Sequence, residues 1–214
     1  MKWKGTFALF ITCVFVFILQ HIFPWITSAF SLYPPAVKER PYLLITALFL
    51  HENLQHLTNN MIALLIFGVA LEMVTDTKYL LATFFISGIF GNIAACFFYP
   101  SSFSLGASGA IMGIIGTLTV IRPLMIVWFG GPMPMIMLAG IWIIVNIAGL
   151  FDKYSNIGYA AHVFGFLTGV LIGFALKNRF KDKEKSKKKE DEFEISEEEF
   201  EKWEDEWMRC YGDG

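Results

Sequence analysis

Charged side chains are scarce over most of this 214-residue chain. Most of its 17 Lys and Arg residues and its 19 Asp and Glu residues follow residue 176. The two signs nearly balance, which leaves no basic surface of the kind that binds nucleic acid. Hydrophobic residues make up 55% of the chain, above the roughly 45–50% of soluble domains. The sequence therefore predicts a membrane protein with a charged tail.

Two further absences narrow the class of protein. Cysteine occurs three times, and two of these residues, Cys13 and Cys96, lie inside apolar runs, which does not indicate a disulfide framework. The first apolar run is not followed by the small-residue cleavage site of a signal peptide. We therefore expect this run to be a retained membrane anchor.

The apolar segments predict an all-α, polytopic membrane protein, because a bilayer core needs about 20 apolar helical residues. The loop 26–55 is too interrupted by Pro34-Pro35 and by charges to form a span. Residues 1–176 are expected to form a membrane domain with a long first loop, and residues 177–214 a charged tail. The six predicted spans are 6–23, 56–72, 79–98, 108–121, 134–150 and 159–176.

Basic residues at the two ends predict the orientation in the membrane. Lys2 and Lys4 precede the first span, and a run of Lys and Arg from Lys177 follows the last. Cytoplasmic segments carry this excess, so both termini are expected in the cytoplasm of a plasma-membrane protein. Six spans then place the loops before Ser108 and His162 on the outer side.

The tail turns acidic after residue 189. A capping box at Ser196–Glu199 and the helical spacing of Phe200, Trp203 and Trp207 predict a short amphipathic helix. We favour a solvated tail over a dedicated partner site here. The basic run before it can also contact anionic lipid head groups.

The fourth predicted span is unusually short and opens with a serine. Residues 108–121 cover only about 21 Å at 1.5 Å per residue, against about 30 Å of hydrocarbon. If Arg122 lies at one interface, Ser108 lies below the other. A polar group inside the bilayer is a candidate functional residue, and we predict that Ser108 is a nucleophile.

The second span opens with a polar cluster whose role is open. His51 and His56 are five residues apart and cannot ligate one metal in the i, i+4 manner of a zinc protease, so we expect no metal and no cofactor. His56 and Asn60 are i, i+4 and share a helix face. They can be hydrogen-bond donors to an oxyanion or interhelical hydrogen-bonding residues, and both alternatives fit equally.

Glycine stripes on two spans predict a close helix pair. Small residues on one helix face let another backbone approach, and packing these two helices would bring His162 to Ser108. The two stripes are Gly109, Gly113 and Gly116 on one span and Gly165, Gly169 and Gly173 on the other.

Acidic residues are absent from the last four predicted spans, so no Ser-His-Asp triad can form within them. A dyad remains, in which His162 takes the Ser108 proton and returns it to the leaving amine. The Ser108 backbone N–H, at a helix N-terminus, could contribute to an oxyanion site.

The chain resembles the rhomboid family of intramembrane serine proteases over about residues 5–176. The resemblance rests on Gly106-Ala-Ser108-Gly109, on His162 with Gly165, and on His51, His56 and Asn60 in this order. It implies a serine endopeptidase that cleaves transmembrane protein substrates near the outer membrane face.

The same resemblance assigns roles to residues. Ser108 would be the nucleophile and His162 the base, with His56, Asn60 and the Ser108 N–H around the oxyanion. Gly106 and Gly109 would shape the loop and helix start, and His51 would be a polar structural residue near the cavity. Glu72 would make structural hydrogen bonds.

Two positions depart from the family's pattern. The Trp-Arg pair common in its first loop is missing, with Arg40 the nearest candidate. The position one turn after the nucleophile, which is often aromatic in the family, is Met112, and a methionine holds an imidazole ring less firmly. We still expect activity.

Two other functions fit a polytopic chain. A weak or inactive rhomboid-like protein would bind transmembrane helices without cleaving them, but the nucleophile and the base are both present. A transporter would show internal repeats or matching broken helices, and the sequence has neither.

Overall fold

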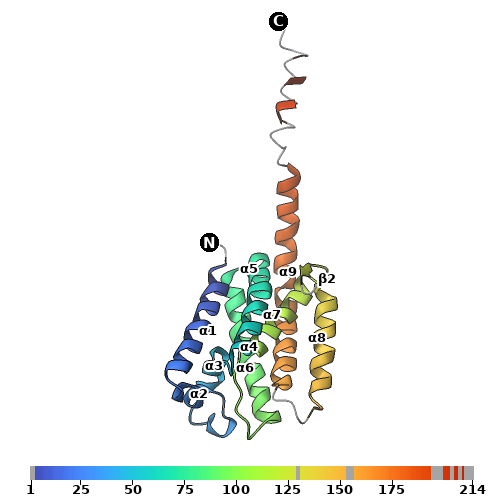
Figure 1. The fold of residues 1–214 in the computed structure, drawn as a ribbon. Coiled ribbons are helices and arrows are strands. Elements are labelled where there is room, and N and C mark those ends of the chain that lie inside the picture. The colour runs from blue at the N-terminus through green and yellow to red at the C-terminus, as the bar shows by residue number, and fades with distance from the viewer. Residues whose placement is uncertain are drawn as a thin grey trace. The chain divides into compact units, whose positions relative to one another are not determined.

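The computed structural model describes residues 3–128, 131–152, 157–193, 200–202, 205, 206 and 209. The chain divides into two compact units, Met1–Lys177 and Asn178–Gly214, and each is described by itself. The first unit is a helical bundle with one short hairpin (Figure 1). In chain order, the elements are α1 (Lys4–Ile22), α2 (Trp25–Phe30), η1 (Pro34–Ala36), α3 (Leu43–Thr46), η2 (Ala47–Phe49), α4 (Leu54–Ala63), the π-helical η3 (Leu64–Gly68), α5 (Val69–Val74), α6 (Thr77–Phe98), α7 (Ser108–Ile121), β1 (Ile126–Trp128), β2 (Pro132–Pro134), α8 (Met135–Gly149) and α9 (Tyr159–Phe193).

Four helical segments of the described chain are long and apolar enough to cross a membrane. They are α1, the continuous run Leu54–Val74, α6 and Tyr159–Phe180 of α9. The apolar helices α7 and α8 are shorter, so the six-span count stays a prediction. The second span begins two residues before the predicted His56, because the Asn53 side chain caps it by accepting the His56 N–H at 2.8 Å.

Helix α7 lies in the middle of the first unit, between α5, α6, α8 and α9 (Figure 1). Eleven of its 14 residues are buried. The surrounding helices instead expose large apolar side chains, such as Ile11 on α1, Ile144 on α8 and Leu171 on α9. This distribution suits a bundle whose outer face meets lipid and whose central helix meets only protein.

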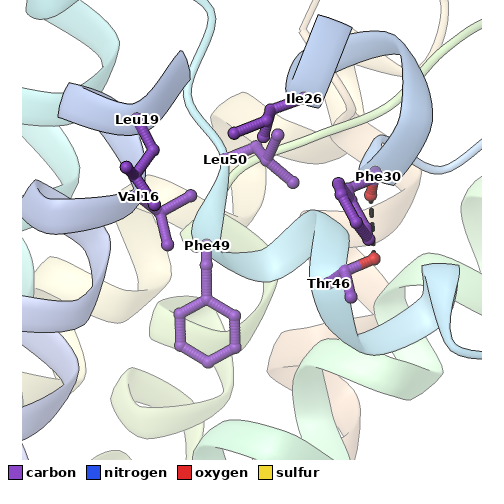
Figure 2. Close-up of a pocket in the computed structure, with 7 residues that line it drawn as sticks. All are labelled: Val16, Leu19, Ile26, Phe30, Thr46, Phe49 and Leu50. Carbon is purple, nitrogen blue, oxygen red and sulfur yellow. Dashed lines mark hydrogen bonds between the residues drawn. The ribbon is translucent and has the colours of Figure 1, made fainter. Parts of the chain in front are cut away.

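The stretch between α1 and α4, expected as a loop, contains the short helices α2, η1, α3 and η2. Its end is fixed to α1 by Gln20, whose Oε1 accepts the His51 N–H at 3.1 Å and whose Nε2 donates to the His51 carbonyl at 3.2 Å. The Thr46 hydroxyl donates to the Phe30 carbonyl at 2.8 Å. Figure 2 shows both residues at an apolar cavity of about 240 Å³ between α1 and these short helices. The lining of this cavity is almost entirely apolar, so the cavity offers no group for catalysis.

Glu72 joins the end of the second span to the start of the first. Its carboxylate accepts the backbone N–H groups of Gly5 and Thr6, each at 2.9 Å, and the hydroxyls of Thr6 and Thr77. The side chain therefore pairs the otherwise unsatisfied N–H groups at the start of α1, which is a structural contact.

One short hairpin adds to the mostly helical fold that the sequence predicts. The segment after α7 contains the antiparallel strands β1 and β2, with Val127 paired with Met133. Alternation of exposed Ile126, buried Val127 and exposed Trp128 carries the strand signal, but three residues are too few to recognise it in the sequence.

In the second unit, α9 continues through the basic run and ends at Phe193. No Pro or Gly interrupts this stretch of the helix, and the predicted boundary between membrane domain and tail at residue 177 stays a prediction. Of the predicted amphipathic stripe, Phe200 is helical and exposed. Trp203, Trp207 and the capping box lie outside the described residues.

Candidate active site

Ser108 is the first residue of α7, and the loop before it sets its position. Gly106 has φ +125°, a conformation that side chains disfavour, and its N–H donates to the Ala47 carbonyl at 2.9 Å. A second link joins this loop to the first one, where Leu32 and Ser104 exchange two backbone hydrogen bonds of 2.9 Å. The start of α7 is therefore held by backbone contacts to the segment between α1 and α4.

His162 lies in the first turn of α9, next to Ser108. Its Nε2 is 2.7 Å from the Ser108 Oγ, a hydrogen bond between residues 54 apart in the sequence. This is the contact that a general base and its serine nucleophile require.

The glycines of α7 and α9 face one another. A Cβ atom added to Gly165 would overlap the Gly109 carbonyl, and one added to Gly169 would lie 2.7 Å from the Gly113 Cα. The Thr117 hydroxyl also donates to the Gly169 carbonyl at 2.8 Å. Backbone therefore packs on backbone along this interface, as for small-residue helix pairs.

The remaining members of the two stripes lie in the same interface. A Cβ on Gly116 would overlap the Phe166 carbonyl, and one on Gly173 would lie 2.8 Å from the Val120 Cβ. Gly91 of α6, which the sequence analysis did not single out, also approaches α9: its Cβ would lie 2.7 Å from the Ala161 carbonyl oxygen. Small residues of α6 and α7 therefore let both helices pack closely on α9.

Ser108 and His162 line a cavity of about 820 Å³. His56 and Asn60 of α4 line the same cavity, together with the polar side chains of Gln55, Asn59, Asn92, Tyr99, Ser102 and Ser104. A lining this polar can hold water. The cavity therefore joins the predicted nucleophile, base and oxyanion donors around one space that water can enter.

The His56 ring lies beside the loop that precedes the serine. A Cβ on Gly106 would lie 2.8 Å from both Cε1 and Nε2 of His56, and 3.9 Å from the Ser108 Oγ. Asn60 donates one amide hydrogen to the His56 carbonyl at 2.9 Å, which leaves its second amide hydrogen free to serve a ligand.

His51 lies behind this cavity rather than in its lining. Its side chain is 1% exposed, and its ring meets the His56 ring edge-on with 5.2 Å between centroids. Neither ring nitrogen makes a well-formed hydrogen bond. Burial, assisted by His56 and opposed by the Phe49 backbone, lowers the pKa of His51 to about 4. It is therefore a neutral ring near pH 7.

Met112 is buried and lines the cavity one turn after the serine. An aromatic contact to His162 comes from Tyr159 on its own helix, whose ring meets the imidazole edge-on at 6.3 Å and 82°. Gly149 leaves room for that ring, because a Cβ there would overlap it.

Asn146 of α8 also belongs to this site, although the sequence alone assigned it no role. Its Oδ1 is 2.6 Å from the Nδ1 of His162. The signal was available, because Asn146 is the only strongly polar side chain within α8. Because the last four predicted spans lack acidic residues, the sequence indicated a site of two residues, Ser108 and His162.

The part of the chain that the structure describes has no group of three His, Cys, Asp or Glu residues that could hold an ion.

Comparisons of the sequence with known proteins point to one family. Residues 38–179, about two thirds of the chain, match the family model of the rhomboid domain. RHOMBOID-like protein 6, mitochondrial, of Arabidopsis thaliana is 35% identical over 136 residues, which are 62% of this chain and 43% of that protein. Rhomboid-like protease 3 of Toxoplasma gondii is 32% identical over 147 residues, 67% of this chain and 54% of that protein.

A third relative is Rhomboid protein 1, mitochondrial, of Saccharomyces cerevisiae, which is 31% identical over 145 residues, 61% of this chain and 40% of its own length. The chain thus spans about half, or less, of the curated relatives it matches. The match of the family model to most of the chain identifies this protein as a member of the rhomboid family.

Proposed function

We propose that this protein is an intramembrane serine endopeptidase that cleaves transmembrane protein substrates. The observation that carries the proposal is the 2.7 Å contact between His162 Nε2 and Ser108 Oγ. This contact lies at the first residue of a buried helix and in a polar cavity. A serine hydroxyl is a weak nucleophile until a neighbouring base removes its proton, and this geometry supplies that base.

In the first step, His162 Nε2 takes the Ser108 proton while Oγ attacks the substrate carbonyl carbon. The tetrahedral intermediate collapses when the protonated imidazole gives that proton to the leaving nitrogen and the C–N bond breaks. Water from the cavity then attacks the resulting ester, again through His162, and restores the serine hydroxyl.

The oxyanion site would combine three donors. Ser108 begins α7, so its N–H has no acceptor within the helix and lies at the positive end of the helix dipole. The His56 ring, placed beside Gly106, and the second amide hydrogen of Asn60 are the other two. Each such donor is worth about 10²–10³ in kcat.

The substrate class follows from the depth of the serine. We propose that α7 and α8 also lie within the bilayer, which gives six spans and a long first loop. At about 1.5 Å per residue α7 is roughly 9 Å shorter than the hydrocarbon core, so Ser108 lies inside the membrane. Its substrates are therefore themselves transmembrane segments, reached from the surrounding lipid.

The charge pattern supports one orientation. Lys2 and Lys4 around the start of α1 and the basic run after residue 176 favour cytoplasmic termini, with the active site open to the outer side of the plasma membrane. Residues 177–214 then form the cytoplasmic tail. Reporter fusions at the two termini and at the loop 99–107 test this orientation.

Cleavage of a transmembrane reporter in liposomes tests the proposal. The wild type should release the outer fragment, and Ser108→Ala or His162→Ala should reduce cleavage to background. Unchanged cleavage in either variant contradicts the proposal. Binding of the reporter by a folded wild type that never cleaves it would instead support the helix-binding, inactive alternative.

A further inference from the structure

Asn146 joins the active site from a third helix. Its Oδ1 is 2.6 Å from His162 Nδ1, and the opposite ring nitrogen is 2.7 Å from the Ser108 Oγ. A continuous chain of hydrogen bonds therefore runs from α8 through the imidazole to α7. We propose that Asn146 is a positioning residue that fixes the ring orientation and the tautomer of His162; this rests on the proteolytic function proposed above.

The orientation of the Asn146 amide follows from its second partner. The Nδ2 of Asn146 is 2.8 Å from the Trp142 carbonyl oxygen, one turn earlier on α8. A backbone carbonyl only accepts hydrogen bonds, so the amide nitrogen must face it and the amide oxygen must face His162. This contact resolves the ambiguity that an amide in isolation would have.

The tautomer of His162 is then determined. An amide oxygen accepts only, so Nδ1 must carry the ring hydrogen, and a neutral imidazole carries one. Nε2 is left with a lone pair, which is the atom that meets the serine hydroxyl. The opposite tautomer would present an N–H to Ser108 and could not remove its proton.

A neutral amide fits this position better than a carboxylate. No Asp or Glu residue occurs in α6, α7, α8 or the first unit's part of α9, and an ionised group is costly inside a membrane. Asn146 orients the ring without adding charge, as the asparagine of papain-like proteases does for their histidine. His162 is thus hydrogen-bonded at both ring nitrogens, to Asn146 and to Ser108.

Kinetics of two variants test the role. Asn146→Ala should lower kcat by about 10- to 100-fold, by analogy with the loss of the hydrogen-bond partner that orients a metal-bound histidine, with KM unchanged. Asn146→Asp keeps an acceptor oxygen for His162 Nδ1 but loses the donor to the Trp142 carbonyl, so it should recover only part of that loss. Val145→Ala, one residue away on an exposed face of α8, is the matched control and should cleave at the wild-type rate.

A spectroscopic measurement tests the tautomer of His162 directly. Nitrogen-15 NMR of the His162 ring should show a protonated Nδ1 and an unprotonated Nε2 at neutral pH, and Asn146→Ala should show both tautomers. A wild-type ring protonated at Nε2, or a folded Asn146→Ala protein with wild-type kcat, overturns the proposal. A wild type with the expected tautomer but no cleavage would refute the protease function and leave the Asn146 contact standing, so the two failures are distinguishable.

Discussion

Helices α7 and α9 approach so closely that one added methyl group between them should separate Ser108 from His162. In Gly169→Ala, the new Cβ would lie 2.6 Å from the Gly113 carbonyl carbon and 2.7 Å from its Cα. Carbon atoms pack at about 3.5–4.0 Å, so the two helices must separate by roughly 0.8 Å or more. The Ser108–His162 hydrogen bond, now 2.7 Å, would lengthen by a similar amount.

A misplacement of about 1 Å in a catalytic group can cost about 10²-fold in rate, and overpacking costs about 1–3 kcal/mol of stability. We therefore expect Gly169→Ala to lower kcat/KM by about 10²-fold, measured by reporter cleavage in liposomes alongside thermal unfolding in detergent. The control is Gly140→Ala on α8, where an added Cβ meets nothing within 4 Å and activity should be unchanged. A folded Gly169→Ala protein with wild-type kcat/KM would refute the reasoning.

Three other substitutions test separate parts of the account. Gly106→Ala places a side chain at φ +125° and a Cβ 2.8 Å from the His56 ring; displacing one oxyanion donor should lower kcat by about 10²–10³-fold in the cleavage assay, and an unaltered kcat would remove His56 from the oxyanion site. Glu72→Ala leaves the N–H groups at the start of α1 unpaired and should lower the free energy of unfolding by about 1–3 kcal/mol, while cleavage at low temperature persists; equal stability would contradict the structural role. His51→Phe removes a buried ring whose pKa is about 4. Because the unfolded chain binds a proton below pH 6.5 and the folded chain does not until about pH 4, the wild type should lose stability as pH falls through this range, on the order of 1.4 kcal/mol per pKa unit. Thermal unfolding should show a weaker pH dependence in His51→Phe, and identical dependence would contradict the burial argument.

Sequence patterns predicted the long apolar helices and the buried position of α7 because a bilayer imposes strong rules. Apolar length indicates a span, and a residue such as Ser108 stands out within one. The glycine stripes predicted that α7 and α9 approach, since spacing along a helix determines which residues share a face. The comparisons confirm the rhomboid family that the serine, histidine and asparagine motifs predicted.

The features that escaped prediction depend on contacts between distant segments. Asn146 was visible as a polar residue in an apolar helix, but nothing local shows that its amide faces His162 of another helix. The β1–β2 hairpin is too short to produce a periodic signal, and the short helices between α1 and α4 are fixed by tertiary contacts such as Gln20 with the His51 backbone. Spacing cannot reveal such pairings, because each partner lies on a different element.

Covalent labelling at Ser108 tests the central claim most directly. A fluorophosphonate probe bonds only to a serine that a base has activated, and mass spectrometry of the labelled peptide identifies the residue. The account predicts a single adduct on Ser108 in the wild type and none in His162→Ala. Labelling of another serine, or equal labelling of Ser108 without His162, would contradict it.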